Sequence, residues 1–431
     1  MSVLAQYCKG RGDCVFGSDM AESPVTQRLK KEGITVFVPQ RYGQIPPNTE
    51  LAVVSRAVKS NNPEILECKQ KGIPTCFREE FLGSVFNEFP NGIAVSGMHG
   101  KTTVSAMLAE ILTAAGKRPV CFVGGNSAGF QNGGAGSSGK VCVAEACEYQ
   151  KSFLQLRPKI SVVLNLEKEH LDCYRNFAEI QNTFRQFALQ TKAGGSVLYN
   201  ADDPNAFLFQ TLSNGKSFGK HGDYSFQNEG QIDGKYFADV QKGNAFCGKL
   251  QLNVLGRHNL QNAVAAFAAA DLVGVPQKIS LQVLNNFQGV ERRLTQMPCA
   301  FTRLYCDYAH HPTEIRMALN SLKALRPRRL FAVFQPHTYS RTKWLFQDFL
   351  SAFTGAEVCL LPTYAAREGE ECGLSSKTLF DALQNRQPAT YCDTFLQAAE
   401  YLKQNATEED VVAVLGAGDV YRLCDFLKGE F

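Results

Sequence analysis

The sequence lacks the features that mark membrane-spanning, exported and strongly charged proteins. No apolar run is long enough to cross a bilayer, and the opening residues, MSVLAQYCKGRGDC, contain no apolar signal core. The formal net charge is only +4 over 431 residues, which gives no reason to expect nucleic acid or a membrane surface as a partner. We therefore expect a cytoplasmic protein with no membrane insertion and no nucleic-acid partner.

Paired cysteine motifs are also missing. The 15 cysteines are scattered and none forms a CxxC pair. We therefore expect reduced thiols that serve as small apolar residues rather than zinc ligands or disulfides. Repeats of fixed period and low-complexity tails are absent too. With 44% hydrophobic and 20% charged residues, the chain has a globular composition, and its length predicts several domains.

Strand-like and helix-like segments alternate along the chain, which predicts an α/β fold whose sheets are mainly parallel. The expected strands lie near 14–19, 34–39, 51–55, 92–97, 140–146, 160–167, 304–308, 330–334, 358–362 and 411–419. The expected helices include 23–33, 101–115, 176–190, 257–275, 311–325 and 341–353. The segment 223–254 is polar, interrupted by glycine and β-like. We expect three domains, at residues 1–88, 89–294 and 295–431.

The stretch SGMHGKTT lacks the usual spacing of a phosphate-binding loop, G-x-x-x-x-G-K-[ST]. Gly97 and Gly100 are separated by two residues, and Val95 stands where the earlier glycine would be. The two glycines can still turn backbone N–H groups inward at a helix N-terminus. Lys101 could reach phosphates, and Thr102 could offer a hydroxyl to Mg²⁺. The alternative is a glycine turn that caps a helix; we favour nucleotide binding because a buried strand and an amphipathic helix flank the loop.

Acidic residues follow the next two buried strands. They are Glu145 and Glu148 after the first, and Glu167, Glu169, His170 and Asp172 after the second. The carboxyl ends of parallel strands share one edge of a sheet, where ligands bind. Oxygen ligands favour Mg²⁺ or Mn²⁺ over zinc. For Glu169 and Asp172 a solvated acidic loop is an equally good interpretation, whereas for Glu145 and His170 we favour function.

Amide side chains provide a weaker indication of a nucleotide site. Asn259 and Asn262 share one face of the helix expected at 257–275, and amides can donate to and accept from an adenine edge. Asn259 is also a plausible helix cap, which is the commoner use of asparagine there.

Two further loops carry chemistry in the last third of the chain. In YCDYAHHPTEI, Asp307 ends a strand and His310 and His311 follow it. The two histidines have no third zinc ligand at a suitable spacing. In FQPHTYSRTKW, His337 and Arg341 follow the next strand. Cationic and hydroxyl groups at one sheet edge favour a site for a carboxylate or a phosphate.

Taken together, these blocks resemble the Mur ligases, the ATP-dependent amide-forming enzymes of bacterial cell-wall synthesis. The matching blocks run along nearly the whole chain: GSDMAESPVTQRL, SGMHGKTT, EACEYQKSFL, NLEKEHLDCY, GRHNLQNA, FQGVERRL, DYAHHPTEI, FQPHTYSRT, LLPTYAAREGEE and VLGAGDVYRL. The resemblance implies a Rossmann-like UDP-binding domain, a P-loop ATPase-like central domain and a Rossmann-like C-terminal domain. It is strongest to the member that joins L-alanine to UDP-N-acetylmuramate.

The resemblance also implies roles for single residues. Those expected to bind ATP are Gly97, Gly100, Lys101, Thr102, Thr103, Asn259, Asn262, Arg293 and Asp307. Those expected to hold Mg²⁺ are Thr102, Glu145 and His170. Those expected in catalysis are Lys101, Glu145, His170, Arg293, His310, His337 and Arg341, the last three facing the muramyl carboxylate and the amino acid.

In this family the lactyl carboxylate takes the γ-phosphoryl group, and the amine of alanine then displaces phosphate. The resemblance implies that the third domain closes over the second and excludes water, and that the protein is a monomer or a weak homodimer. Three alternatives stay open: a related ligase that recycles a preformed tripeptide, a Mur-like binding protein that has lost turnover, and a generic P-loop kinase or ATPase.

The N-terminus departs from the family pattern. Mur ligases usually begin with a strand and a Gly-rich turn that ends in Met-Ser and cradles the UDP pyrophosphate, and here Met1 and Ser2 align with the end of that turn. We expect that the native chain starts upstream; an incomplete first domain with impaired UDP binding is the alternative. Met98 and Thr338 are milder departures, replacing a usual Thr and a frequent Arg.

Overall fold

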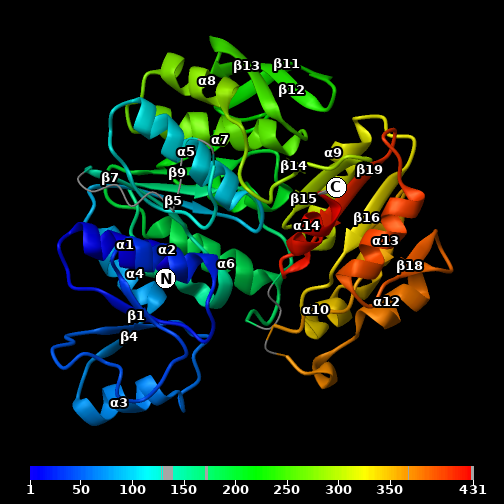
Figure 1. The fold of residues 1–431 in the computed structure, drawn as a ribbon. Helices are drawn as coiled ribbons and strands as arrows, with labels where there is room; N and C mark the ends of the chain where they lie inside the picture. Colours follow the sequence, from blue (N-terminus) through cyan, green and yellow to red (C-terminus); the bar gives the residue numbers. More distant parts are fainter. Residues whose placement is uncertain (128, 130–138, 170–172, 367, 429–431) are drawn as a thin grey trace. The chain divides into compact units, whose positions relative to one another are not determined.

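The computed structural model describes residues 1–127, 129, 139–169, 173–366 and 368–428. The chain forms two compact units. One comprises Met1–Gln227, Val240–Gly248 and Asn262–Leu284, and the other comprises the remaining segments. Both are α/β in character with mainly parallel sheets, which confirms the predicted fold class (Figure 1).

The N-terminal segment alternates helices and short strands. Its elements are α1 (Ser2–Gly10), β1 (Phe16–Ser18), α2 (Pro24–Lys31), β2 (Thr35–Phe37), β3 (Ala52–Val54), α3 (Pro63–Lys71), β4 (Thr75–Phe77) and α4 (Arg78–Asn87). Strand β1 pairs with β2 and β3 pairs with β4, both in parallel. The parallel pairing agrees with the prediction, but we expected one sheet and the strands form two separate two-stranded sheets. With three residues each, these strands offer few backbone groups for a wider ladder.

Local sequence signals explain where two of the N-terminal helices, α2 and α3, begin. The Ser23 side chain accepts the Thr26 N–H at 3.2 Å, and Pro24 occupies the first turn of α2. Asn62 accepts the Glu64 N–H at 2.9 Å ahead of α3. Side-chain caps satisfy N–H groups that have no partner within the helix, and proline needs no such partner at that position.

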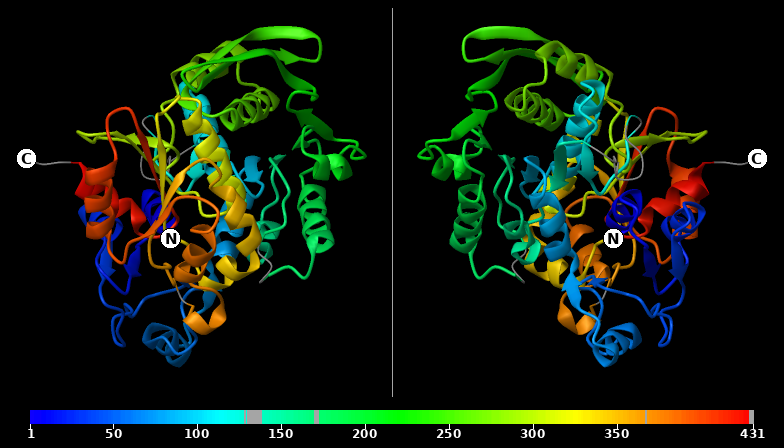
Figure 2. Two further views of the ribbon diagram at one scale, coloured as in Figure 1. Left: turned by 90° about the vertical axis from the view of Figure 1, so that its right-hand side faces the viewer. Right: turned by 90° about the vertical axis from the view of Figure 1, so that its left-hand side faces the viewer.

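The largest sheet has nine strands, in the order β13-β12-β11-β10-β9-β8-β5-β7-β6. Its strands are β5 (Asn91–Ser96), β6 (Val120–Phe122), β7 (Val141–Glu145), β8 (Ile160–Val163), β9 (Ser196–Asn200), β10 (Gly215–Phe218), β11 (Tyr224–Ile232), β12 (Lys235–Lys242) and β13 (Ala245–Leu255). Strand β5 lies between β7 and β8 and is parallel to both. The β-like segment expected at 223–254 forms the long strands β11–β13, drawn in green in Figure 2.

Helices cover both faces of this sheet. They are α5 (Lys101–Ala114), α6 (Phe177–Leu189), α7 (His258–Leu272) and α8 (Gln277–Asn286), with short 3₁₀ turns at Tyr149–Gln155 and Pro204–Phe209. Helix α5 packs on β5 and β7. On the other face lie α1, α4 and α6 (Figure 1). Their apolar residues form one buried cluster with alternate residues of the strands, among them Ala94, Cys142 and Val163. This packing holds the carboxyl ends of β5, β7 and β8 in fixed register.

The C-terminal part contains a six-stranded sheet in the order β14-β15-β19-β16-β17-β18. The strands are β14 (Thr295–Met297), β15 (Arg303–Asp307), β16 (Leu330–Phe334), β17 (Glu357–Leu360), β18 (Ala389–Tyr391) and β19 (Val411–Leu415). Only β14 is antiparallel to its neighbour among these pairs. Strands β16 and β19 are buried at every position, as expected for the middle of a doubly wound sheet.

The helices of this part are α9 (Pro312–Lys323), α10 (Tyr339–Trp344), α11 (Phe346–Ala352), α12 (Ser376–Leu383), α13 (Phe395–Asn405) and α14 (Leu423–Leu427), with 3₁₀ turns at Glu370–Cys372 and Val420–Arg422. The single helix expected at 341–353 is wrong, because Leu345 separates α10 from α11. Phe349 and Leu350 of α11 are buried in the core of this part.

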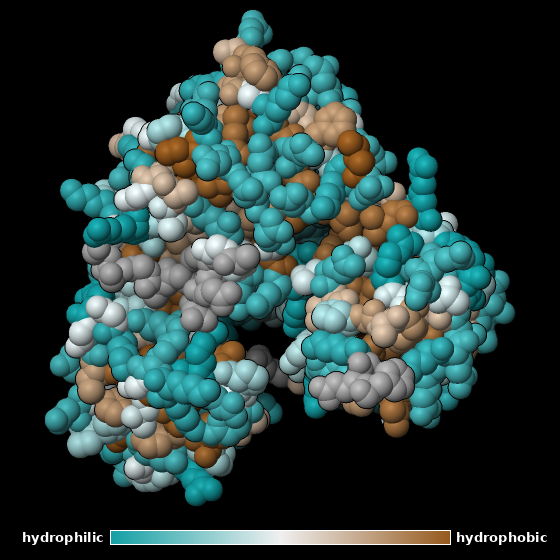
Figure 3. Space-filling model, turned by 45° about the horizontal axis from the view of Figure 1, so that its top comes forward, coloured by the Kyte–Doolittle hydropathy of each residue, from teal (hydrophilic) through white to brown (hydrophobic). Residues whose placement is uncertain are grey.

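All 15 cysteines are unpaired thiols, as expected from the sequence. Within the described residues, no helix combines the length and the apolar character needed to cross a bilayer. On the face drawn in Figure 3 hydrophilic residues predominate and apolar residues are scattered among them.

Candidate functional site

The loop between β5 and α5 is a tight turn that only glycine accommodates well. Gly97 and Gly100 have φ values of +138° and +84°, where other residues are strained. A Cβ on Gly97 would lie 2.9 Å from the Cβ of Leu164, and one on Gly100 would lie 2.7 Å from Oδ1 of Asn262. The backbone is therefore in close contact with the segment after β8 and with α7. Asn262, one of the predicted adenine residues, lies beside the loop.

A side chain from the end of β8 holds the loop in place. Oδ1 of Asn165 accepts the His99 N–H at 2.8 Å, and Nδ2 of Asn165 donates to the His99 carbonyl at 3.1 Å. Gly100 is the N-cap of α5, and no described side chain caps this helix. An uncapped helix start carries partial positive charge and inward N–H groups, which suits an anion such as phosphate.

Lys101, the first residue of α5, points its ammonium back into the loop. Nζ donates to the carbonyls of Gly97 and Met98, the second at 3.0 Å, and lies 2.9 Å and 3.2 Å from the two carboxylate oxygens of Glu148. Burial, the largest single effect, lowers the pKa of Lys101, but the Glu148 carboxylate, with smaller contributions from Cys147 and Glu169, outweighs burial and raises the pKa above its ordinary value. The ammonium is therefore charged at neutral pH.

Thr102 and Glu145 come together beside this loop. Oγ1 of Thr102 donates to one carboxylate oxygen of Glu145 at 3.1 Å, and the Gly124 N–H donates to the other at 2.6 Å. A hydroxyl and a carboxylate side by side are the donors that a hard divalent cation prefers. The residues present therefore fit a Mg²⁺ ion. Thr103 is buried in the first turn of α5.

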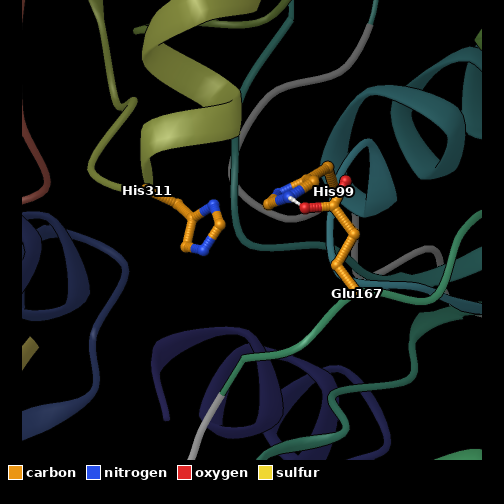
Figure 4. Close-up of side chains that lie close together, drawn as sticks. All are labelled: His99, Glu167 and His311. Carbon is orange, nitrogen blue, oxygen red and sulfur yellow. Dashed lines mark ion pairs between the residues drawn. The ribbon is translucent and has the colours of Figure 1, made fainter. Parts of the chain in front are cut away.

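The acidic segment after β8 contributes a second contact to the loop. Nε2 of His99 lies 3.4 Å from a carboxylate oxygen of Glu167, and Figure 4 shows the two side chains turned toward each other. Glu169, for which a solvated loop was an equal alternative, is buried. His170 and Asp172 lie outside the described residues, so the expected role of His170 stays a prediction.

The expectation that Asn259 caps α7 is wrong. The helix begins at His258, so Asn259 lies inside it. The buried Asn259 amide donates to the Leu255 carbonyl at 2.7 Å. This contact ties the end of β13 to the start of α7. The amide therefore serves the backbone through a donor contact.

Asp307, at the end of β15, is a buried carboxyl group with three fixed neighbours. Its two oxygens accept the backbone N–H groups of Leu294 and Ala309, each at 2.7 Å. Burial raises the pKa of Asp307 to about 6, although the nearby Arg293 guanidinium opposes the rise. The Arg293 guanidinium itself lies 5.2 Å from the centre of the Tyr308 ring. The structure thus brings two of the predicted ATP-binding residues close together.

His310, His337 and Arg341 form a second cluster, at the edge of the sheet where β15 and β16 end. The rings of His310 and His337 lie 5.9 Å apart, and an Arg341 N–H lies 3.2 Å from Nδ1 of His337. Burial, together with His310 and Arg341, lowers the pKa of His337 to about 4. The imidazole is therefore neutral near pH 7. The three residues lie together, as the shared sheet edge predicts.

The partners of this cluster define its orientation. The His337 ring stacks on Tyr364 with centres 5.5 Å apart, and Nδ1 of His310 lies 3.2 Å from a Glu314 carboxylate oxygen. His311, which we considered as a zinc ligand, caps α9 by accepting the Thr313 N–H at 3.3 Å. The Arg341 guanidinium supplies positive charge to this group, suited to a carboxylate or phosphate.

Sequence reasoning missed three residues of these clusters. It grouped Glu148 with possible metal ligands, but the structure pairs it with Lys101. It overlooked Asn165, although its position directly after a buried strand was a usable signal. It also overlooked Arg292, whose guanidinium lies between the rings of Tyr308 and Tyr421 at 4.9 Å and 4.6 Å.

Comparisons with known proteins agree with this arrangement. Three family profiles match in order: "Mur ligase family, catalytic domain" over residues 1–90, "Mur ligase middle domain" over 95–270 and "Mur ligase, glutamate ligase domain" over 292–418. A UDP-N-acetylmuramate–L-alanine ligase of Caldicellulosiruptor saccharolyticus is 35% identical over 435 residues, covering 99% of this chain and 95% of the relative. One from Clostridium novyi is 37% identical over 437 residues, with coverage of 100% and 95%.

Solved structures point the same way. The UDP-N-acetylmuramate–alanine ligase of Thermotoga maritima superposes with a TM-score of 0.82 at 27% identity, covering 99% of this chain and 95% of that one. A murein peptide ligase of Psychrobacter arcticus shares the fold with a TM-score of 0.74 at 22% identity, covering 100% and 97%. The three family profiles and the relatives that match over nearly their whole length show that the chain belongs to the Mur ligase family.

Proposed function

We propose that the protein joins L-alanine to the lactyl carboxylate of UDP-N-acetylmuramate, with hydrolysis of ATP to ADP and phosphate. The observation that carries this proposal is the match, over nearly the whole of each chain, to relatives named for that reaction. The loop geometry supports it independently, since Lys101, Thr102 and Glu145 surround a helix start that suits a triphosphate. The division into three domains at residues 1–88, 89–294 and 295–431 is part of the proposal.

The chemistry requires activation of a poor electrophile. A carboxylate oxygen attacks the γ-phosphorus of ATP, the bond to the β-phosphate oxygen breaks, and ADP leaves. The product is an acyl phosphate, whose carbonyl carbon the neutral amine of alanine attacks. The carbon–oxygen bond to phosphate then breaks, the amide forms, and the amine gives up a proton. Each step moves negative charge onto oxygen atoms, which positive groups nearby stabilise.

The loop residues have defined tasks in this scheme. Gly97 and Gly100 let the backbone approach the phosphates, and Lys101 balances the charge that develops on the transferring group. The Asn165 clamp on His99 keeps the loop in one conformation, so little reorganisation is needed on binding. Preorganised charge of this kind contributes several kcal/mol in typical active sites, on the order of 3 kcal/mol for one donor.

We propose that Thr102 and Glu145 hold Mg²⁺, with His170 assisting at a second ion. An ion held there would supply positive charge that offsets part of the negative charge of the phosphates. The support is the contact between the Thr102 hydroxyl and the Glu145 carboxylate. Asn259, Asn262, Arg293 and Asp307 are proposed to serve the nucleotide as well, and for Asn262 the supporting observation is its closeness to Gly100.

His310, His337 and Arg341 are proposed to bind carboxylate groups of the substrates. The neutral imidazole of His337 accepts or donates one hydrogen bond, and the Arg341 guanidinium supplies the charge. We further propose a cytoplasmic protein that acts as a monomer or a weak homodimer; the unpaired thiols support a reducing compartment.

The test is an assay of purified protein with ATP, Mg²⁺ and UDP-N-acetylmuramate, in which ADP and the amide are both quantified. We expect one amide per ADP with L-alanine, little product with a preformed tripeptide, and no product for Lys101→Ala. Preference for the tripeptide would assign the protein to the recycling reaction. ADP release at a rate that does not depend on the amine would contradict the proposal and indicate a simple ATPase.

A further inference from the structure

The ion pair between Lys101 and Glu148 has no role in the scheme above, although it is largely buried beside the loop. Glu148 has 2% of its side chain exposed and Lys101 has 16%. One carboxylate oxygen lies 2.9 Å from Nζ and the other lies 3.2 Å from it. Buried pairs of this kind cost desolvation and rarely add net stability. Its presence beside a phosphate loop therefore calls for a functional explanation.

The position of Glu148 is fixed by its backbone as well as by the ion pair. Its carbonyl accepts the hydroxyl of Tyr174, which is buried, and the N–H of Lys151 at 2.9 Å. It lies at the start of the 3₁₀ turn Tyr149–Gln155, shortly after β7. The carboxylate is therefore held against the ammonium by packed elements on two sides.

The loop backbone holds the ammonium from the other side. Nζ donates to the Gly97 and Met98 carbonyls, so its acceptors, together with the Glu148 carboxylate, are in a fixed arrangement. The ammonium is thus pointed into the loop before any nucleotide arrives.

We propose that Glu148 is a positioning residue that acts through Lys101. It fixes the Lys101 ammonium in the loop in the orientation used during phosphoryl transfer, and its negative charge weakens the binding of ATP in the ground state. The proposal rests on the proposed function for the identity of the anion. A carboxylate this close to the ammonium repels the incoming phosphates, whereas a correctly placed ammonium is most valuable when charge spreads in the transition state.

The test compares Glu148→Gln with wild type, because glutamine keeps the shape and an acceptor oxygen and removes the charge. Binding of a non-hydrolysable ATP analogue with Mg²⁺, measured by calorimetry without the other substrates, should become tighter by about tenfold. The kcat should fall by about tenfold or more because Lys101 loses its fixed orientation. Glu148→Asp should recover part of kcat and return analogue affinity toward the wild-type value.

A matched control is available in the same unit. Glu179 pairs with Lys151 at 2.6 Å, but the two side chains are 27% and 42% exposed. Glu179→Gln should leave analogue affinity and kcat unchanged. The proposal is overturned if Glu148→Gln leaves both quantities unchanged, or if affinity and kcat fall together with thermal stability while Glu148→Asp restores none of them. Calorimetry needs no turnover, so a protein that binds the analogue but forms no amide would refute the proposed function and leave this inference standing.

Discussion

Asp307 is expected to make the stability of the C-terminal unit depend on pH in an unusual direction. Burial raises its pKa from 3.8 to about 6. A carboxyl group that binds its proton more tightly in the folded state stabilises the fold most when it is protonated. Its ionisation therefore lowers the free energy of unfolding as the pH rises from about 4 to about 6. A shift of about two pKa units corresponds to about 3 kcal/mol. Asp307→Asn removes this titration.

The asparagine variant resembles the protonated carboxyl group, with one oxygen left to accept a backbone N–H. We therefore expect it to match wild type near pH 4 and to become more stable than wild type, by up to about 3 kcal/mol, above pH 6. The assay is urea unfolding at a series of pH values without nucleotide. The single tryptophan, Trp344, lies in the same unit as Asp307, so its fluorescence follows the unfolding of that unit.

Asp410 provides a control of opposite sign. Burial alone would raise its pKa, but hydrogen bonds from Arg328 and Arg329 outweigh burial and lower the pKa below its ordinary value. Its contribution is therefore present at neutral pH and lost as pH falls, and Asp410→Asn should destabilise most at neutral pH. The reasoning about Asp307 is refuted if the difference between Asp307→Asn and wild type is independent of pH, or if the variant loses stability relative to wild type as pH rises.

Three further predictions concern the loop and the second cluster. Gly100→Ala adds a Cβ 2.7 Å from Oδ1 of Asn262 at a φ of +84°. Calorimetry should show that the variant binds an ATP analogue at least about tenfold more weakly, and the strain should lower the free energy of unfolding by about 1–3 kcal/mol. Unchanged binding would contradict the loop geometry. Glu145→Gln should raise the Mg²⁺ concentration for half-maximal activity by about tenfold, as expected on loss of a charged oxygen ligand; an unchanged Mg²⁺ titration would exclude it as a ligand. The pKa of His337 is lowered to about 4, so the contribution of this residue to stability falls as the pH drops from about 6.5 to about 4. His337→Gln should therefore gain stability relative to wild type as the pH falls through this range. A stability difference that stays constant with pH in urea unfolding would contradict the lowered pKa.

Much of the loop could be predicted from sequence because its determinants are local. A Gly-Lys-Thr stretch between a buried strand and an amphipathic helix leaves few alternatives for the backbone. The meeting of Thr102 with Glu145 followed from a general rule, since the carboxyl ends of parallel strands share an edge. The same rule placed His310, His337 and Arg341 together. In these cases secondary structure and strand order were sufficient.

Side-chain partners that depend on tertiary packing could not be predicted. Glu148 follows Glu145 by three residues, and only the irregular turn after β7 decides that it meets Lys101 rather than a cation. The amide of Asn259 had a usual role as a cap, but the early start of α7 turned it to Leu255. Likewise, no glycine or proline marks the break at Leu345.

The sequence also could not predict which strands of the N-terminal segment join into one sheet. Alternating strands and helices correctly indicated parallel pairing, but short strands carry little information about which neighbours join into one sheet. The observed pairs β1–β2 and β3–β4 depend on packing around helices such as α2, whose Leu29 contacts Ile34 and Val36 in a small core of its own. A three-residue strand cannot specify such a choice by its pattern alone.

The most direct test of the central claim follows the oxygen atoms of the acid substrate. UDP-N-acetylmuramate labelled with oxygen-18 in the lactyl carboxylate is incubated with the protein, ATP, Mg²⁺ and L-alanine, and the released phosphate is analysed by mass spectrometry. If a phosphoryl group activates the carboxylate, one labelled oxygen atom appears in each phosphate that accompanies an amide bond. Amide formation with unlabelled phosphate would contradict the account.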